Sequence, residues 1–537
     1  MELPRAMTQI ESVRKTAYVE TYGCQMNVSD GELMQGILAA GGYDIVTKPE
    51  DADVVLVNTC AIREHAERRV IGRVGELYRL KTERPDMIIG VTGCMAQRLG
   101  ERLLDRAAYV DLVMGPDGYR TLPETLGRLR ADHPGAVAAS GSTGQAASAR
   151  AGVAASARAG AKESAGSGPR SRRALPVMAA EADESARDDD RLAILAFRED
   201  ENYEGLEVRR ASGITAWVPV QRGCNYRCTY CIVPYVRGAE KNRAAGDILD
   251  EIRGIVQRGI TEVTLLGQTV NSWEHGGWHF PQLLRAVARV DGIRRVRFTS
   301  PHPNDLTPEL VDVMASEPNV CRQLHLPVQS GHDRTLKRML RRYTVAEYLE
   351  RVDMVREAMP GIALSTDIIV AFAGETDEEY EATLNLMRRV RYDDAFLYRY
   401  SPREGTPAMR LPADQFIAPD VAQQRLERLI DVHRAIQSEI NTGEVGSTVE
   451  VLVERAARSP GDMLGRTASY KVVAFPGDAS LTGTYMHVRL TATTGATFRG
   501  VAVDAPRGAR MDAQRDAARA AVHDAAPGAP HGTVRVA

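Results

Sequence analysis

Short apolar runs alternate with longer stretches of mixed apolar and charged residues over residues 14–130. We expect buried strands at 17–24, 53–60, 87–94 and 110–115. The segments between them predict helices, one that starts at a cap formed by Ser29 or Asp30 and ends near Ala40, and one over residues 63–81. Buried strands separated by helices predict a doubly wound parallel sheet.

The same alternation returns on a larger scale over residues 210–442. We expect strands at 217–220, 262–266, 296–299, 323–326, 365–372 and 394–400. Helices are expected between them, for example at 245–257, 281–290 and 345–358. Strands joined by crossover helices predict an open, partial (β/α)6 barrel, whose active site should lie where the strands end.

Residues 443–506 contain shorter apolar runs separated by glycines. We expect strands at 448–453, 468–473, 487–491 and 497–501. This pattern predicts a small antiparallel β-barrel. The fold class of the whole chain is therefore α/β, with the barrel as a separate C-terminal unit.

Two segments have too few apolar side chains to bury a core. Residues 131–209 are rich in Ala, Gly, Ser and Arg, and we interpret them as a low-complexity insertion or linker. An alternative is an RNA-contacting arm that uses Arg170, Arg172 and Arg173. Residues 507–537 are expected to form a disordered tail.

Composition narrows the function classes. The net charge is -3, so any contact with nucleic acid must rely on a local basic surface. The chain has seven cysteines, an odd number that argues against a disulfide framework. The first residues do not form a signal peptide and there is no long apolar run, so we expect no membrane span and a reducing cytoplasmic location.

The chemistry is concentrated in three cysteines, Cys224, Cys228 and Cys231, which follow the first strand of the central unit. We call them the core trio. A closed zinc site or a simple electron-transfer cluster needs four protein ligands. On a four-iron cluster, three thiolates leave one iron open for an outside ligand. The alternative is a zinc site completed by a distant histidine.

Cys24, Cys60 and Cys94 form a second set, the N-terminal trio. Each closes a predicted strand of the first unit. Because parallel strands end at one edge of a sheet, where ligands bind, we expect these thiols to converge. They too are one ligand short of four. The alternative is three unrelated buried cysteines, since cysteine is commonly buried.

Three sequence blocks surround the N-terminal trio: Thr-Tyr-Gly-Cys-Gln-Met-Asn at 21–27, Asn-Thr-Cys-Ala-Ile-Arg-Glu-His-Ala-Glu at 58–67 and Gly-Cys-Met-Ala-Gln-Arg at 93–98. Together with the core trio and a C-terminal barrel like a TRAM domain, they resemble the methylthiotransferases, a family of radical S-adenosylmethionine (SAM) enzymes. Within the family, the resemblance is greatest to enzymes that act on N6-dimethylallyladenosine in tRNA. It covers about residues 14–130 and 210–505.

The resemblance implies two 4Fe-4S clusters. One is held by Cys224, Cys228 and Cys231 and binds SAM, and an auxiliary one is held by Cys24, Cys60 and Cys94. The implied substrate is a tRNA anticodon stem-loop with N6-dimethylallyladenosine at position 37, which receives a methylthio group on C2. The C2–H bond is inert to side-chain bases, so radical chemistry from a cofactor is required. We expect two SAM per product, and no catalytic residue is assigned outside the clusters.

Further residues are candidates for contacts with SAM. Tyr230 precedes the last core cysteine, and Gln268 and Glu375 follow the second and fifth strands. Their alternative role is that of polar strand ends facing water. The sequence has Ala371 and Ala373 where the family has glycine and proline, and Thr269 where asparagine is common. We expect these changes to affect rate before function.

Candidate RNA contacts are basic residues of the core and the barrel, although solvated surface is the favoured alternative for any single one of them. They are Arg294, Arg295, Arg297, Lys337, Arg338, Arg341, Arg342, Arg466 and Lys471. Expected protein partners are a low-potential electron donor of the flavodoxin or ferredoxin type and a sulfur or cluster donor. We expect a monomer.

Three rival functions share part of this pattern. Sister enzymes methylthiolate an aspartate of a ribosomal protein or threonylcarbamoyladenosine in tRNA, and they too carry both trios. The blocks at 21–27 and 58–67 favour N6-dimethylallyladenosine in tRNA. A rival of another class is an iron–sulfur RNA-binding protein without catalytic activity, which SAM cleavage by the reduced protein would exclude.

Overall fold

The computed structural model describes residues 14–61, 64–107, 109–131, 191–210 and 213–503. Among these residues, no helix is both long enough and apolar enough to cross a membrane. The N-terminal unit is built on a six-stranded parallel sheet in the order β2-β1-β3-β4-β5-β6. Its strands are β1 (Lys15–Tyr22), β2 (Tyr43–Ile45), β3 (Val54–Thr59), β4 (Ile88–Gly93), β5 (Leu112–Met114) and β6 (Leu192–Ile194).

Helices cover both faces of this sheet, as the doubly wound prediction requires. The helices are α1 (Gln25–Ala40), α2 (Glu64–Glu83), α3 (Cys94–Leu99), α4 (Arg102–Arg106) and α5 (Leu122–Ala131). α1 and α5 share one hydrophobic cluster with the sheet, and α2, α3 and α4 share another on the opposite face. β3 and β4 are buried along their whole length because both faces are covered.

Two expectations for this unit were wrong, and one strand was missed. α1 begins at Gln25 with Cys24 as its N-cap residue, so Ser29 and Asp30 lie inside the helix, buried, and do not cap it. β2, a three-residue strand with one buried residue, was not predicted. β6 falls within the segment that we interpreted as a linker, yet it pairs with β5 in the sheet. Residues 132–190, with the proposed arginine arm, and the tail after 503 lie outside the described residues.

The central unit has two three-stranded parallel sheets, in the orders β13-β10-β7 and β14-β15-β16. The strands are β7 (Thr215–Pro219), β10 (Glu262–Leu266), β13 (Arg295–Phe298), β14 (Gln323–His325), β15 (Ala363–Val370) and β16 (Asp394–Arg399). A parallel bridge between Val296 and Val320 lies between the two sheets, and one hydrophobic core runs through both. This arrangement confirms the open, partial barrel.

The helices of the central unit are α6 (Val233–Arg237), α7 (Ala245–Gln257), α8 (Phe280–Ala288), α9 (Pro308–Ser316), α10 (Asp333–Arg338), α11 (Val345–Ala358), α12 (Asp377–Val390) and α13 (Pro419–Glu444). Two short antiparallel pairs complete it: β8 (Gln221–Arg222) with β9 (Lys241–Asn242), and β11 (Glu274–His275) with β12 (Trp278–His279). α11 and α12 each begin with a capping box, in which Thr344 and Thr376 exchange hydrogen bonds with a glutamate three residues later.

The C-terminal unit is a closed barrel in the order β17-β18-β19-β21-β20. Its strands are β17 (Thr448–Ala456), β18 (Asp462–Thr467), β19 (Val472–Pro476), β20 (Tyr485–Thr493) and β21 (Thr497–Ala502). The barrel was predicted, but in detail it differs in three ways. β18 was not among the expected strands, the expected strand at 468–473 is mostly the turn between β18 and β19, and β19 pairs with β21 in parallel.

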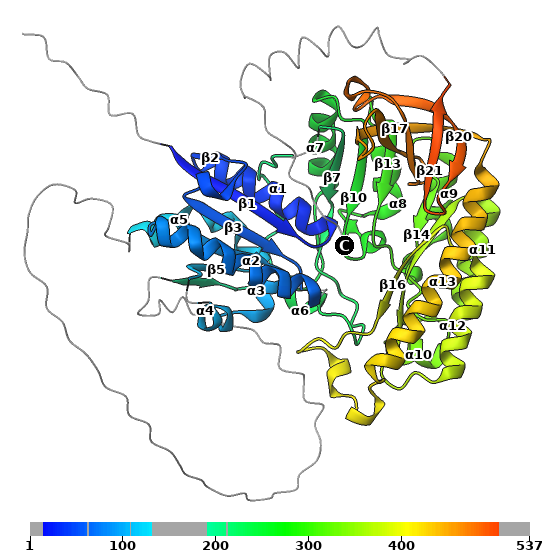
Figure 1. Cartoon of the computed structure of the whole chain (residues 1–537), viewed down its shortest axis with the longest axis horizontal. Helices are drawn as coiled ribbons and strands as arrows, with labels where there is room; N and C mark the ends of the chain where they lie inside the picture. Colours follow the sequence, from blue (N-terminus) through cyan, green and yellow to red (C-terminus); the bar gives the residue numbers. More distant parts are fainter. Residues whose placement is uncertain (1–13, 62–63, 108, 132–190, 211–212, 504–537) are drawn as a thin grey trace, which may run out of the picture.

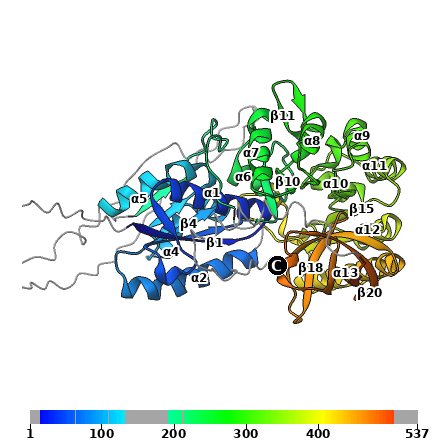
Figure 2. The same ribbon diagram turned by 90° about the horizontal axis from the view of Figure 1, so that it is seen from above.

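The three units lie side by side. Figure 1 shows the N-terminal unit (blue) next to the first strands of the central unit (green), with the barrel (orange to red) against the central unit, and Figure 2 shows the same order from above. A buried ion pair between Arg222 and Asp117 joins the N-terminal and central units. Arg295 and Arg297 of β13 donate hydrogen bonds to backbone carbonyls of the barrel.

Candidate active site

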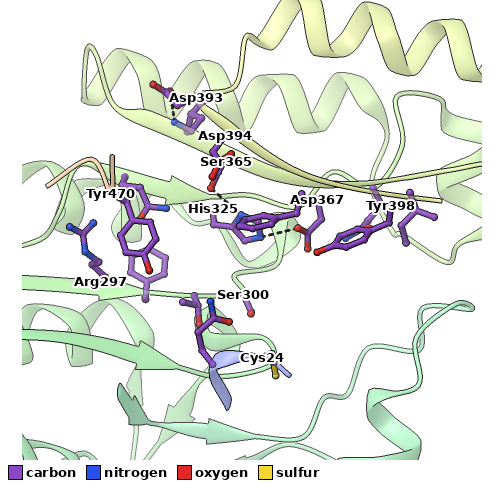
Figure 3. A pocket seen from close by; sticks show the side chains of 18 of the residues that line it. Cys24, Arg297, Ser300, His325, Ser365, Asp367, Asp393, Asp394, Tyr398 and Tyr470 are labelled. Atoms are coloured by element: carbon purple, nitrogen blue, oxygen red, sulfur yellow. Dashed lines mark hydrogen bonds and ion pairs between the residues drawn. The ribbon is translucent and has the colours of Figure 1, made fainter. Parts of the chain in front are cut away.

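A cavity of about 750 Å³ lies where the three units meet. The N-terminal unit contributes Cys24 and Cys60 to its lining, the central unit contributes Cys231, and the barrel contributes Tyr470 and Lys471. Figure 3 shows side chains from the strands of the central unit pointing into this space, with Cys24 on its opposite side. The strands of the N-terminal sheet end toward it, as expected for a ligand site in a parallel sheet.

The N-terminal trio follows three neighbouring strands. Thr59 pairs with Tyr22 on one side and with Gly93 on the other, so Cys24, Cys60 and Cys94 each lie just past a strand end. Gly23 has a φ of +130°, and a Cβ at this position would come within 2.5 Å of the Cys60 Cβ. The close approach of these two segments therefore requires glycine.

The pKa values of two thiols of this trio, Cys24 and Cys94, are shifted in opposite directions. A hydrogen bond with Cys60 lowers the pKa of Cys24 to about 6, against the opposing effect of burial. Cys24 also donates to the side-chain carbonyl of Asn27 over 3.2 Å. Burial raises the pKa of Cys94, whose sulfur accepts a hydrogen bond from Arg237 Nε over 3.1 Å. Metal ions bind the thiolate form, so binding would displace the remaining protons.

The core trio lies on the loop between β8 and α6. Cys224 and Cys228 are buried, and Cys231 lines the cavity. The hydroxyl of Thr269 lies 3.1 Å from Cys224 Sγ, and Arg341 Nη1 lies 3.6 Å from Cys228 Sγ. Burial raises the pKa of the Cys231 thiol to about 12.

Within the described residues, no group of three Cys, His, Asp or Glu side chains is arranged to hold a single metal ion. The ligation of a cluster by either trio stays a prediction. The Oε1 atom of Gln268 is buried and has no hydrogen-bond partner within the described residues. It is therefore placed to accept a hydrogen bond from a bound molecule, such as from the amino group of SAM.

The three candidate SAM contacts differ in position. Tyr230 lines the cavity, and Gln268 adjoins the residue that contacts Cys224. Glu375 is buried outside the cavity lining, where it accepts hydrogen bonds from Arg425 and from the backbone N–H of Ala371. Its contact with SAM stays a prediction.

Ala371 itself adopts a left-handed backbone conformation, with a φ of +58°. This is the position at which the family has glycine, so the chain tolerates a strained residue there. The backbone is held by Glu375, which accepts from the Ala371 N–H over 2.7 Å. The substitution therefore does not remove the turn that leads from β15 to α12.

Most of the proposed RNA contacts have other partners. Arg295 and Arg297 are buried between the core and the barrel, and both pair with Glu262. The other engaged residues are Arg294 with Glu450, Arg338 with Glu379, Arg341 with Tyr343, Arg466 with Glu454, and Lys471 with Asp393 and Glu444. Lys337 and Arg342 are exposed and remain candidates.

The structure also shows contacts between polar and aromatic side chains that the sequence did not predict. His325 lies between Ser365 at 3.0 Å and Asp367 at 3.6 Å, and all three line the cavity (Figure 3). Tyr226 of the core-trio loop stacks on His302, with ring centroids 3.7 Å apart. Strand ends predicted a general position for such residues, but only the three-dimensional packing identifies the pairs.

Comparisons with known proteins agree with this architecture. The uncharacterized protein family UPF0004 matches residues 16–115, the radical SAM superfamily matches residues 218–387, and the TRAM domain matches residues 443–503. The fold of a radical SAM methyltransferase, TsrM from Kitasatospora setae, solved with cobalamin and a [4Fe-4S] cluster, is similar, with a TM-score of 0.50 and 14% identity over 75% of this chain and 78% of that one. The chain is a radical SAM enzyme with a TRAM domain.

Its relatives identify the family. A tRNA-2-methylthio-N(6)-dimethylallyladenosine synthase of Moorella thermoacetica is 39% identical, and the match covers 91% of this chain and 99% of the relative. The enzyme of the same name from Cereibacter sphaeroides is 38% identical over 92% of this chain and the full length of the relative. The chain belongs to the tRNA-2-methylthio-N(6)-dimethylallyladenosine synthase family.

Proposed function

We propose that this protein transfers a methylthio group to C2 of N6-dimethylallyladenosine at position 37 of tRNA. One observation supports this function above all: thiols of both trios and side chains of the barrel line the same cavity. A single cofactor site would need only one trio. Two trios on one cavity suit a reaction that both activates a C–H bond and delivers sulfur.

We assign the two cofactor sites as follows. The core trio, Cys224, Cys228 and Cys231, holds the 4Fe-4S cluster that binds SAM, and the N-terminal trio, Cys24, Cys60 and Cys94, holds the auxiliary 4Fe-4S cluster. When bound, these groups supply the radical C–H activation, the sulfur and the methyl group, with two SAM used per product. Tyr230 and Gln268 orient SAM, and Glu375 supports the backbone beside it.

The protein's own side chains bind and orient the base. A base in a single-stranded loop can be splayed out of its stack into an enclosed pocket. Phe396, Tyr398 and Tyr470 line the cavity and offer faces on which a base can stack. His325 also lines the cavity, where its two ring nitrogens are held by Ser365 and Asp367.

The partners follow from this reaction. The TRAM barrel contacts the anticodon stem-loop, a low-potential flavodoxin or ferredoxin supplies electrons, and a sulfur or cluster donor restores the auxiliary site. We propose that the protein acts as a monomer in the cytoplasm. The barrel borders the cavity through Ser469, Tyr470 and Lys471, which supports a route for the RNA along this side.

Nucleoside analysis tests the proposal directly. The protein, reconstituted without oxygen, is incubated with SAM, a reductant and tRNA that carries N6-dimethylallyladenosine. We expect 2-methylthio-N6-dimethylallyladenosine, with one 5′-deoxyadenosine and one S-adenosylhomocysteine per product. Matched reactions use tRNA with unmodified adenosine, tRNA with threonylcarbamoyladenosine, and ribosomal protein. The proposal would be contradicted if product formed with one of these three substrates and not with tRNA that carries N6-dimethylallyladenosine. It would also be contradicted if SAM were cleaved in none of the four reactions.

A further inference from the structure

The loop that carries the core trio also reaches into the N-terminal trio. α6 ends at Arg237, which is buried against the N-terminal unit. Arg237 Nε donates to Cys94 Sγ over 3.1 Å, and its Nη2 donates to the carboxylate of Asp30 over 2.6 Å. The short segment 232–237 therefore joins Cys231 of one trio to a guanidinium bonded to a thiol of the other.

Packing fixes this contact in place. Ile232 and Val236, on either side of the start of α6, form one buried hydrophobic cluster with Ala61 and Cys94 of the N-terminal unit. α6 also lies against α3, which begins at Cys94. The position of Arg237 is thus determined by a built interface between the two units, and not by a flexible side chain at a surface.

One nitrogen of the guanidinium has no partner within the described residues. Arg237 is 2% exposed, and its Nη1 is buried without a hydrogen-bond partner within the described residues. Oδ1 of its partner Asp30 is likewise buried and unpartnered. A buried cation with an unused donor is costly unless an acceptor completes its shell. An iron–sulfur cluster on the N-terminal trio brings thiolate and sulfide acceptors to this place.

The core trio has a comparable arginine that lacks this feature. Arg341 Nη1 lies 3.6 Å from Cys228 Sγ, but its Nε donates to Tyr343 and its Nη2 to the Pro327 carbonyl. Every nitrogen of Arg341 therefore has a partner before a cluster is bound. Arg222 also has a buried nitrogen without a partner within the described residues, its Nε, but no hydrogen bond joins Arg222 to a thiol. Arg237 combines both features: an unpartnered nitrogen and a hydrogen bond to a thiol of the N-terminal trio.

We propose that Arg237 is a positioning residue for the auxiliary cluster, which donates hydrogen bonds to sulfur, offsets part of the cluster's negative charge and ties the core-trio loop to the N-terminal unit. This role rests on the assignment of that cluster to the N-terminal trio under the proposed function. The reduction potential of an iron–sulfur cluster depends on net charge and on hydrogen bonds to its sulfurs. Arg237 supplies both, so it raises the potential of the auxiliary cluster.

The test isolates the auxiliary cluster in the full chain. The core trio is replaced by alanine, the protein is loaded with iron and sulfide without oxygen, and the potential is measured by a redox titration followed by electron paramagnetic resonance. We expect Arg237→Gln to shift the midpoint potential to more negative values. Arg237→Lys, which keeps the charge but loses the planar double donor, should give a smaller shift in the same direction.

Arg222→Lys is the matched control. Arg222 is buried in the same seam, pairs with Asp117 and donates to the Glu201 carbonyl, but no hydrogen bond joins it to a thiol. We expect this variant to unfold at a lower temperature, as any change to a buried ion pair does, and to leave the potential unchanged. A comparable shift in Arg222→Lys would overturn the specific role of Arg237.

The remaining outcomes also decide the matter. An unchanged potential in Arg237→Gln at full iron content overturns the proposal, and if that variant does not fold, an unchanged potential in Arg237→Lys does so. Loss of auxiliary iron from Arg237→Gln, with an apo-protein melting temperature like that of the control, supports it. The titration needs no tRNA, so failure of methylthiolation leaves it intact. A parent chain whose N-terminal trio takes up no iron overturns both this role and the cluster assignment.

Discussion

Replacing Arg297 with methionine should loosen the barrel from the core. Arg297 Nε donates to Glu262 over 3.0 Å, and its two Nη atoms donate to the carbonyls of Ala468 and Thr467 over 2.8 and 2.7 Å. Removing one member of a buried ion pair costs about 3–5 kcal/mol. Glu262 keeps a second partner, Arg295, at 3.5 Å, so we expect a loss near the lower end, about 3 kcal/mol.

Hydrogen exchange measures this loss locally, which suits a chain of several units better than a global melt. At about 1.4 kcal/mol per factor of ten, the amides of β18 and β19 should exchange roughly a hundredfold faster in Arg297→Met. The matched control is Arg466→Met, whose ion pair with Glu454 is partly exposed and should contribute under about 1 kcal/mol. Unchanged exchange in Arg297→Met, with a weaker salt dependence of tRNA binding, would show that Arg297 contacts RNA and would refute this reasoning.

Four further outcomes are expected. Ala371→Gly should raise stability by about 1 kcal/mol, because glycine relieves the cost of a left-handed φ; a lower melting temperature would count against this. Thr269→Val removes the hydroxyl beside Cys224 and should shift the potential of the SAM-binding cluster to more negative values, whereas Thr269→Ser should not; equal titration curves would contradict the contact. Burial lowers the pKa of His302 to about 2, so between about pH 6.5 and pH 2 the unfolded state alone binds its proton, and stability should fall by about 1.4 kcal/mol per pH unit on acidification through that window; denaturant titrations of His302→Gln should show a smaller dependence. Lys337→Ala should reduce the slope of log Kd for tRNA against log salt by about 0.7, and an unchanged slope would remove this exposed lysine from the RNA contacts.

The alternation of apolar runs predicted most of the framework because several strands, β3, β4, β10 and β13, are buried along their whole length. α7 and α11 have the predicted bounds, since each has a clear apolar stripe between helix signals. The three-residue strands β2 and β6 escaped prediction because β2 has one buried residue and β6 has none, whereas the equally short β5 is buried throughout and was predicted. β6 was further hidden by the low-complexity segment that precedes it.

The helix-cap residues in the sequence predicted the wrong start for α1, because tertiary contacts determine where this helix begins. Ser29 and Asp30 are typical caps, but α1 starts earlier, and Asp30 is used instead to hold Arg237. Basic residues were equally ambiguous, because a sequence does not distinguish an arginine that meets RNA from one that bridges two units, as Arg297 does. The convergence of cysteines was predictable since strand ends share an edge, whereas the side chains that contact their sulfurs come from distant loops.

Reciprocal replacement of the two trios tests the central claim most directly, with iron content, SAM cleavage and methylthiolated product measured on the same samples. If each trio holds its own four-iron cluster on the shared cavity, replacing either trio with alanine should leave about half of the iron. The chain without the N-terminal trio should still cleave SAM, the chain without the core trio should not, and neither should make product. Methylthiolated tRNA from the chain that lacks the N-terminal trio would contradict the account.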